Sequence, residues 1–110
     1  MDDCCNIDEK LYSKLFKAFG DQSRLKIISL LASKEMTVND IAKAVGLSQP
    51  TVSRHLSILK DADLVVDRRD KQRVFYILNK DSVMACCIGF CDCLEITTEG
   101  GKIEIKGYKK

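Results

Sequence analysis

Apolar residues recur at helical spacing near the start of the chain, and polar capping residues separate the helices that this spacing predicts. Residues 8–19 form the first such segment, with an apolar stripe of Leu11, Leu15, Phe16 and Phe19. Gly20 suits the position after a helix, and Asp21 suits the N-cap of the next one. In that second helix the residues expected to share a face are Leu25, Ile28, Leu31 and Ala32. Two amphipathic helices are therefore expected first.

Two further helices follow, separated by the turn Gly46-Leu47-Ser48. Thr37-Val38-Asn39-Asp40 is typical of a capping box, and Gly46 predicts the end of the helix that it opens. Ser48 caps a helix from about Gln49 to Asp61, with Pro50 in its first turn, where a missing N–H costs little. The residues expected to face the core from this helix recur at i, i+4 and i+7: Val52, Leu56 and Leu59. The pattern predicts a helix-turn-helix.

A hairpin and a last helix complete the predicted fold. Val65–Asp67 and Arg73–Leu78 are rich in β-branched and aromatic residues and flank residues 68–72, which predicts two strands joined by a charged tip. A helix follows from about Asp81 to Glu95. We therefore expect a mainly α fold with a small β-hairpin wing, that is, a winged helix-turn-helix.

The length fits a single small domain, which we assign to residues 1–96, with a C-terminal tail at residues 97–110. The distribution of charge along this domain indicates a nucleic-acid partner. The net charge of the 110-residue chain is only +2, but residues 43–80 hold eight bases and four acids, which favours a polyanion. Gln and Arg pair with base edges in the major groove, whereas Ser, Thr and helix N-termini contact phosphates. Candidate contacts to double-stranded DNA are Ser48, Gln49, Thr51, Ser53 and Arg54 at the start of the helix predicted to end at Asp61, and Arg68, Arg69, Lys71 and Arg73 on the hairpin.

Two segments resemble motifs of the ArsR/SmtB family. Residues 16–28, FKAFGDQSRLKII, resemble its signature F-K-A-L-G-D-P-T-R-L-x-I-L, and residues 47–60, LSQPTVSRHLSILK, are similar to its recognition helix. The resemblance covers about residues 8–95 and implies a homodimeric winged-helix repressor, not an enzyme, that leaves its operator when an inducer binds. It places His55, the one histidine, in the DNA-binding motif. Relatives usually carry Gly where this chain has Ala62, which fits if its φ stays negative.

Six cysteines are the second chemical feature. The acidic start of the chain is unlike a signal peptide, and the longest apolar run, residues 83–91, is far below the ~20 residues that span a bilayer. We therefore expect a cytoplasmic protein without a membrane partner, in which clustered thiols bind metal or sense redox state.

Two inducer sites of the family are absent: residues 37–41 hold no thiol, and the last helix holds no histidine. The candidate metal ligands are Cys86, Cys87, Cys91 and Cys93, and Cys4 and Cys5 are further candidates.

An all-thiolate site selects soft ions. Cys87 and Cys91 stack at i, i+4 on one face of the last helix, and Cys86 and Cys93 stack on another, so one ion could use both faces only if the helix distorts near Gly89. We favour As(III) as the inducer, with Sb(III), Cd(II) and Pb(II) as alternatives and no organic cofactor. A redox or reactive-sulfur sensor is a further alternative. A thiol oxidoreductase is disfavoured because no Cys-x-x-Cys begins a helix and no histidine or acid pair lies near the thiols.

Overall fold

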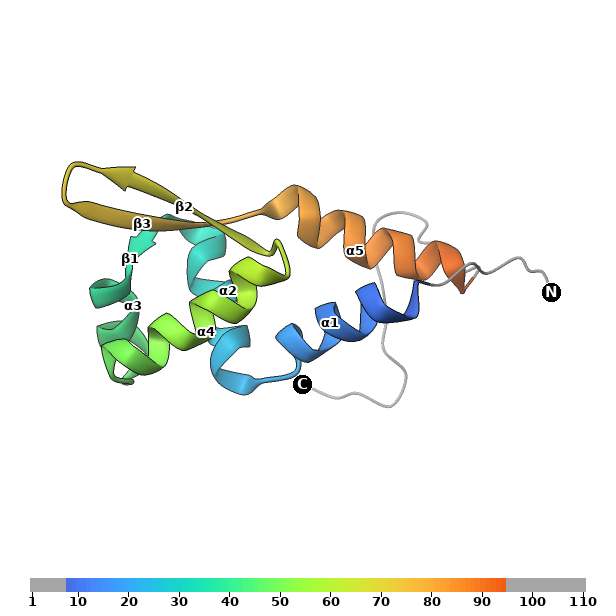
Figure 1. Ribbon diagram of the computed structural model, residues 1–110, viewed down its shortest axis with the longest axis horizontal. Coiled ribbons are helices and arrows are strands. Elements are labelled where there is room, and N and C mark those ends of the chain that lie inside the picture. The colour runs from blue at the N-terminus through green and yellow to red at the C-terminus, as the bar shows by residue number, and fades with distance from the viewer. Residues whose placement is uncertain (1–7, 95–110) are drawn as a thin grey trace.

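The computed structural model describes residues 8–94, in which a helical body carries a hairpin that extends from one end (Figure 1). The helices are α1 (Glu9–Phe19), α2 (Gln22–Ser33), α3 (Val38–Val45), α4 (Gln49–Asp61) and α5 (Lys80–Cys93). The strands are β1 (Met36–Thr37), β2 (Val65–Asp70) and β3 (Arg73–Leu78). This order confirms the predicted mainly α fold with a β-hairpin wing. Cys4, Cys5 and the tail predicted at residues 97–110 lie outside the described residues.

Side-chain caps start the first four helices, three of them at predicted caps and the first at Asp8, which the sequence analysis had placed inside the helix. The oxygens that accept a hydrogen bond from the backbone N–H three residues later, at 3.1 to 3.3 Å, belong to Asp8, Asp21, Thr37 and Ser48. Gly46 ends α3 in the left-handed conformation, with φ of 75°. The last helix begins at Lys80, one residue before the predicted start, because Asn79 caps it through the N–H of Ser82.

The sheet has three antiparallel strands in the order β1-β3-β2. The two-residue strand β1 was not predicted, since a segment this short has no periodicity, and it pairs Met36 with Tyr76. The hairpin tip is shorter than the predicted residues 68–72. The ladder continues to the pair Asp70 and Arg73, so the turn consists of Lys71 and Gln72. Three of the four candidate basic residues of the wing therefore lie in strands and only Lys71 lies in the turn.

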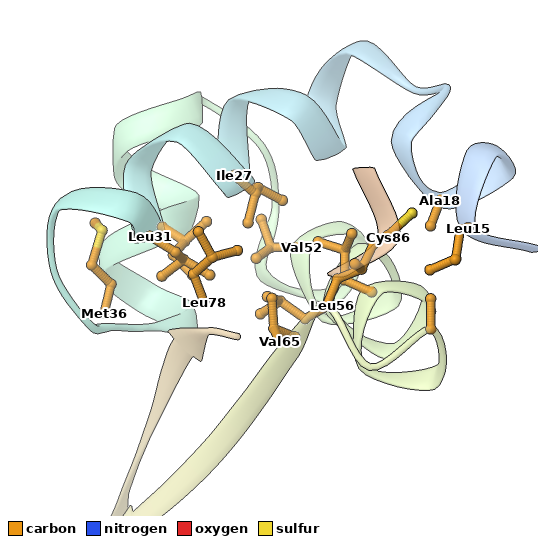
Figure 2. Packing of buried hydrophobic residues seen from close by; sticks show 14 of the residues in the cluster. Leu15, Ala18, Ile27, Leu31, Met36, Val52, Leu56, Val65, Leu78 and Cys86 are labelled. Atoms are coloured by element: carbon orange, nitrogen blue, oxygen red, sulfur yellow. The ribbon is translucent and has the colours of Figure 1, made fainter. Parts of the chain in front are cut away.

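One hydrophobic core lies among α1, α2, α3, α4, the sheet and the middle of α5, and Figure 2 shows labelled side chains converging from α1, α2, α4, the sheet and α5. Val52, Leu56 and Leu59 are at most 1% exposed, as predicted for α4. Two predicted stripes are wrong in part. The chain buries Leu15 and Ala18 from α1, and Ile27 and Leu31 from α2, while the predicted core residues that lie at the surface are Leu11, Phe16, Leu25 and Ala32. The apolar side of α1 is broad and α2 has apolar residues on several sides, so contacts with other elements decide which of these residues are buried.

The turn after α4 has its left-handed residue at Asp63, directly after Ala62. Ala62 has φ of −91°, which confirms the negative φ expected there, and Asp63 takes the positive φ of 61°. Aspartate tolerates this conformation better than most non-glycine residues. The N–H of Leu64 then bonds to the carbonyl of Leu59 at 2.9 Å and directs the chain into β2. Among the described helices, none combines the length and apolar character that crossing a bilayer requires.

Candidate nucleic-acid interface and thiol site

The candidate recognition helix α4 has one buried face and one polar face. The buried face fixes the helix to the core through Val52, Leu56 and Leu59. The candidate DNA contacts on α4 that lie at the surface are Gln49, Thr51, Ser53 and Arg54, and Ser48 is exposed beside them at the N-cap. Polar side chains and free N–H groups at an exposed helix N-terminus are the features that contact DNA in this type of motif.

Two of these polar side chains also hold the first turn of α4 in place. The Ser48 hydroxyl accepts from the N–H of Thr51 at 3.3 Å and donates to Oγ1 of Thr51 at 2.9 Å. Nε2 of Gln49 donates to Oδ1 of Asn39 in α3 at 3.0 Å. Asn39 was not among the predicted site residues, because it lies in the first turn of α3 and the helix-turn-helix turn follows the last. The two helices of the motif are thus joined by a side-chain contact at the surface that would face DNA.

His55 is half-buried and contacts Arg24 of α2, with its Nδ1 3.3 Å from Nη1 of the guanidinium. Arg24 also donates to the carbonyls of Ala18 at 2.8 Å and Lys17 at 3.0 Å, in the last turn of α1. One arginine therefore links α1, α2 and α4. Sequence reasoning did not single out Arg24 as a site residue, although it lies within the family signature quoted above. The structure gives His55 a contact that positions α4, and its predicted contact with DNA stays a prediction.

The basic residues of the wing differ in their contacts and in their exposure to solvent. Arg68 forms two hydrogen bonds with Oε1 of Glu35, at 2.7 and 3.1 Å, so a carboxylate partly neutralises its charge. Its guanidinium and that of Arg73 lie 4.9 and 5.1 Å from the ring centre of Phe75. Arg69 and Lys71 are exposed on the hairpin. The wing thus holds two arginines against an aromatic ring and presents further positive charge toward solvent.

The four described thiols of α5 lie on two different faces. The inner face, defined as Cys86, Gly89, Phe90 and Cys93, is turned toward α1, and α1 and α5 lie side by side in Figure 1. The Phe90 ring centre is 5.3 Å from that of Tyr12 and 4.8 Å from that of Phe16. A Cβ on Gly89 would lie 2.8 Å from Oη of Tyr12, so glycine leaves room for this hydroxyl. The structure thus gives Gly89 a packing role.

The inner thiols share their surroundings with Tyr12. Burial raises the pKa of Tyr12, and the nearby Cys93, Cys86 and Asp8 raise it further. Cys86 is buried, and burial followed by the charge of Cys87 raises the pKa of its thiol. A higher pKa disfavours the thiolate that a soft ion needs as its ligand.

Cys87 and Cys91 lie on the other side of α5. Cys87 is exposed and Cys91 half-buried, and Met84 and Ile88 beside them are 62% and 56% exposed. Within residues 8–94 of one chain, no three His, Cys, Asp or Glu side chains gather closely enough to hold a metal ion. The fold therefore divides the predicted ligands into an inner and an outer pair.

Comparison with known proteins decides the family. The family model described as "Bacterial regulatory protein, arsR family" matches residues 21–66. The transcriptional repressor SdpR of Bacillus subtilis is 43% identical over 67 residues, which cover 61% of this chain and 74% of SdpR. The chain belongs to the ArsR family. The resemblance inferred from residues 16–28 and 47–60 is thereby confirmed.

Two further ArsR-family comparisons bear on assembly and inducer. The solution structure of the homodimeric winged helix-turn-helix DNA-binding domain Mb0332 of Mycobacterium bovis is 31% identical, has a TM-score of 0.66 and covers 78% of this chain and 81% of its own. The arsenical resistance operon repressor of Escherichia coli is 40% identical over 67 residues, or 60% of this chain and 57% of that protein. This ArsR-family chain is thus a DNA-binding transcription regulator, as expected.

Proposed function

We propose that this protein is a homodimeric repressor that binds operator DNA and releases it when a thiophilic metal(loid) occupies thiols of α5. The observation that carries DNA binding is the polarity of α4, whose buried face anchors it while Gln49, Ser53 and Arg54 are exposed on the other. Those side-chain types read base edges and phosphates in the major groove. The repressor assignment is supported by SdpR and by the arsenical resistance operon repressor.

The wing supplies the sequence-independent part of the affinity. Arg69 and Lys71 are exposed, and Arg68 and Arg73 lie against Phe75 in the same hairpin. Each contact of a basic side chain with a phosphate releases a counterion, so the affinity falls as salt rises. Glu35 competes with phosphate for Arg68, because both are anionic partners of one guanidinium.

The inducer is best described by its ligands. All four described candidate ligands are thiols, and the described His55 lies on α4, in contact with Arg24. A donor set of sulfur alone fits As(III), Sb(III), Cd(II) and Pb(II) better than ions that prefer imidazole or carboxylate. We favour As(III), which takes three thiolates, and the relationship to the arsenical resistance operon repressor supports this choice. A bound ion would cross-link thiolates and so fix the position of α5.

A continuous series of contacts joins the thiols to the recognition helix. Phe90 of α5 packs on Tyr12 and Phe16 of α1. The last turn of α1 accepts hydrogen bonds from Arg24, which contacts His55 of α4. A change in α5 is thus transmitted to α4 through packed rings and one guanidinium. Coupling free energies between two such sites are typically about 1–3 kcal/mol, which would weaken DNA binding about 5- to 150-fold.

The test is release of operator DNA followed by fluorescence anisotropy. The reduced protein is bound to labelled DNA from upstream of its own gene and challenged separately with arsenite, Cd(II), Pb(II) and Zn(II). We expect arsenite to release the DNA and Zn(II) to leave it bound. Release by Cd(II) or Pb(II) alone would support the thiol site but contradict As(III) as the inducer.

A matched variant separates the site from non-specific thiol chemistry. Cys87→Ala/Cys91→Ala is expected to bind DNA as the wild type does and to resist arsenite. Unchanged induction in this variant would contradict the assignment of these thiols. DNA binding that no ion disturbs, but that an oxidant or persulfide reverses, would contradict the metal hypothesis in favour of a redox or reactive-sulfur sensor.

A further inference from the structure

The amide side chains of Asn39 and Gln49 meet at the surface between the two helices of the helix-turn-helix. Nε2 of Gln49 donates to Oδ1 of Asn39 at 3.0 Å, although the two residues are ten positions apart in sequence. Asn39 lies in the first turn of α3, Gln49 begins α4, and both are exposed. The first side chain of the candidate recognition helix therefore has a partner on the neighbouring helix.

The turns that carry these two amides are themselves fixed in place. The Thr37 side chain caps α3 and the Ser48 side chain caps α4. Ile41 and Val52, which follow the amides by two and three residues, are 0% exposed and hold the two helices to the core. The Gln49 side chain can still rotate on this fixed backbone, and its hydrogen bond restricts that rotation.

The hydrogen bond also decides which way the Gln49 amide faces. A free glutamine amide can turn over and exchange the places of its oxygen and its nitrogen, which are similar in size. If the Gln49 amide turned over alone, Oε1 would lie against Oδ1 of Asn39, and two acceptors would face each other. Gln49 therefore presents one N–H donor and one acceptor oxygen to solvent in a fixed order.

An amide with this fixed order matches adenine. In the major groove, adenine presents the acceptor N7 beside the donor amino group at N6. Oε1 of Gln49 can accept from the N6 amino group while the second N–H of Nε2 donates to N7. Guanine presents two acceptors, N7 and O6, so Oε1 would face O6 with no proton between them. The held amide therefore favours adenine and rejects guanine.

We propose that Asn39 is a positioning residue for base recognition, and that by holding the Gln49 amide it makes Gln49 specific for adenine. The inference rests on the proposed function, in which α4 enters the major groove, and adds the base that one of its side chains reads. Asn39 acts through Gln49 and need not touch a base itself. Without Asn39, the Gln49 amide can turn over and donate both of its N–H groups to guanine.

A purely structural tie between α3 and α4 predicts a different result. The core already holds the helices together, because Ile41 of α3 and Val52 and Leu56 of α4 are at most 1% exposed. An exposed hydrogen bond contributes little beyond this, since water replaces it when it is lost. Removing the Asn39 side chain should therefore leave urea unfolding nearly unchanged. A structural tie would also leave the choice between bases as it is in the wild type.

The first experiment measures base preference. A duplex that the full-length wild type selects from random-sequence DNA is varied by replacing each A·T pair in turn with G·C, and affinities are measured by anisotropy at fixed salt. We expect an adenine at which guanine weakens wild-type binding at least about fivefold. Asn39→Ala should remove most of this discrimination, because its Gln49 amide is free to turn over.

Two matched variants serve as controls. Asn39→Asp keeps an oxygen that accepts from Gln49 and cannot donate, so it permits only the orientation seen here. We expect it to restore the discrimination against guanine, even where its charge lowers the affinity for every duplex. Lys43→Ala, at an exposed position on the same helix, should discriminate as the wild type does.

The second experiment identifies the base atoms. At the adenine found above, N7 is replaced by carbon, or the N6 amino group by hydrogen. We expect each change to weaken wild-type binding severalfold and to leave Gln49→Ala unaffected, because that variant has no amide to use these atoms. Asn39→Ala/Gln49→Ala should show the same base preference as Gln49→Ala, which would place the effect of Asn39 on Gln49 alone.

The results that overturn this inference differ from those that reject the proposed function. Equal discrimination in the wild type and Asn39→Ala, or a preference for guanine in Asn39→Asp, would overturn the positioning role and leave the repressor intact. So would specific DNA binding in which no adenine is sensitive to Gln49→Ala. A wild type that selects no sequence from the random pool would reject both. Selective binding that arsenite does not reverse would reject the inducer and leave the role of Asn39 standing.

Discussion

Arg24 and His55 lie 31 residues apart in sequence and in contact in the fold, with Nη1 of the guanidinium 3.3 Å from Nδ1 of the imidazole. The same guanidinium donates to the carbonyls of Lys17 and Ala18. It thereby adds donors to carbonyls in the last turn of α1, where the regular helical partners run out. The Lys17 carbonyl also accepts from the N–H of Gly20 at 3.3 Å. The orientation of the recognition helix relative to α1 depends on this side chain.

Removing the guanidinium should therefore destabilise the fold. Arg24→Ala is expected to lower the free energy of unfolding by about 2 kcal/mol, because hydrogen bonds from a charged donor to partly buried carbonyls are lost. Arg24→Lys should fall between this variant and the wild type, since an ammonium lacks the planar fork of donors. Urea unfolding measures the change. Lys26→Ala, an exposed position on the same helix, is the control, and an equal effect at both positions would contradict the role of Arg24.

The cap of α2 makes stability depend on pH. The N–H of Arg24 donates to the Asp21 carboxylate at 3.1 Å, and this bond, with the charge of Arg24, lowers the pKa of Asp21 below its ordinary value of 3.8. A lowered folded-state pKa gives stability that is present above 3.8 and is lost as pH falls through the folded value. Asp21→Asn keeps a capping oxygen but does not titrate. We expect the melting temperature of the wild type to exceed that of Asp21→Asn near neutral pH, and the gap to narrow in acid. A gap independent of pH would exclude this linkage.

Arg54 is exposed on α4 and should act on DNA with little effect on folding. Arg54→Ala is expected to weaken operator binding about tenfold or more, the usual cost of losing one good pair with a base. Anisotropy titrations at one fixed salt concentration measure the affinity, and urea unfolding should show no change. The comparison is Lys26→Ala, which should bind as the wild type does. If Arg54→Ala weakened operator and unrelated DNA equally, Arg54 would contact phosphate and read no base.

Substitutions of the wing residues should change how strongly the DNA affinity depends on salt concentration. Arg69→Ala is expected to reduce the slope of log affinity against log salt by about 1, the value for one lost phosphate contact. Glu35→Gln should act in the opposite direction, because it frees Arg68 from its carboxylate partner. Titrations at several salt concentrations measure both slopes. An Arg69→Ala slope equal to that of the wild type would show that this residue does not reach the backbone.

Local signals account for most of the secondary structure. Asp8, Asp21, Thr37 and Ser48 each start a helix because a short polar side chain can satisfy an N–H only three residues away. The strand β1 was missed because two residues hold no pattern, and it exists only where β3 lies beside it. The extent of the hairpin was underestimated for a similar reason, since pairs such as Arg68 with Phe75 form across strands.

For the candidate site too, the sequence predicted what depends on local spacing and not what depends on contacts between distant residues. Sequence spacing was sufficient to place Gln49 and Arg54 on the open face of α4, because its buried face is periodic and strongly apolar. It also placed the thiols of α5 on two faces, because helical geometry depends only on position along the chain. Which pair is enclosed could not be read from spacing, since α5 has apolar residues all round.

By itself, then, the sequence determined the helices, their caps, the recognition helix and the presence of two thiol pairs, all of which depend on neighbours within a few residues. Only the tertiary structure decided that Tyr12 covers the Cys86 side of α5 and leaves Cys87 exposed. It also decided that Arg24 links three helices. Both outcomes require contacts between residues far apart in the chain, and the free energy of such contacts depends on how whole helices pack.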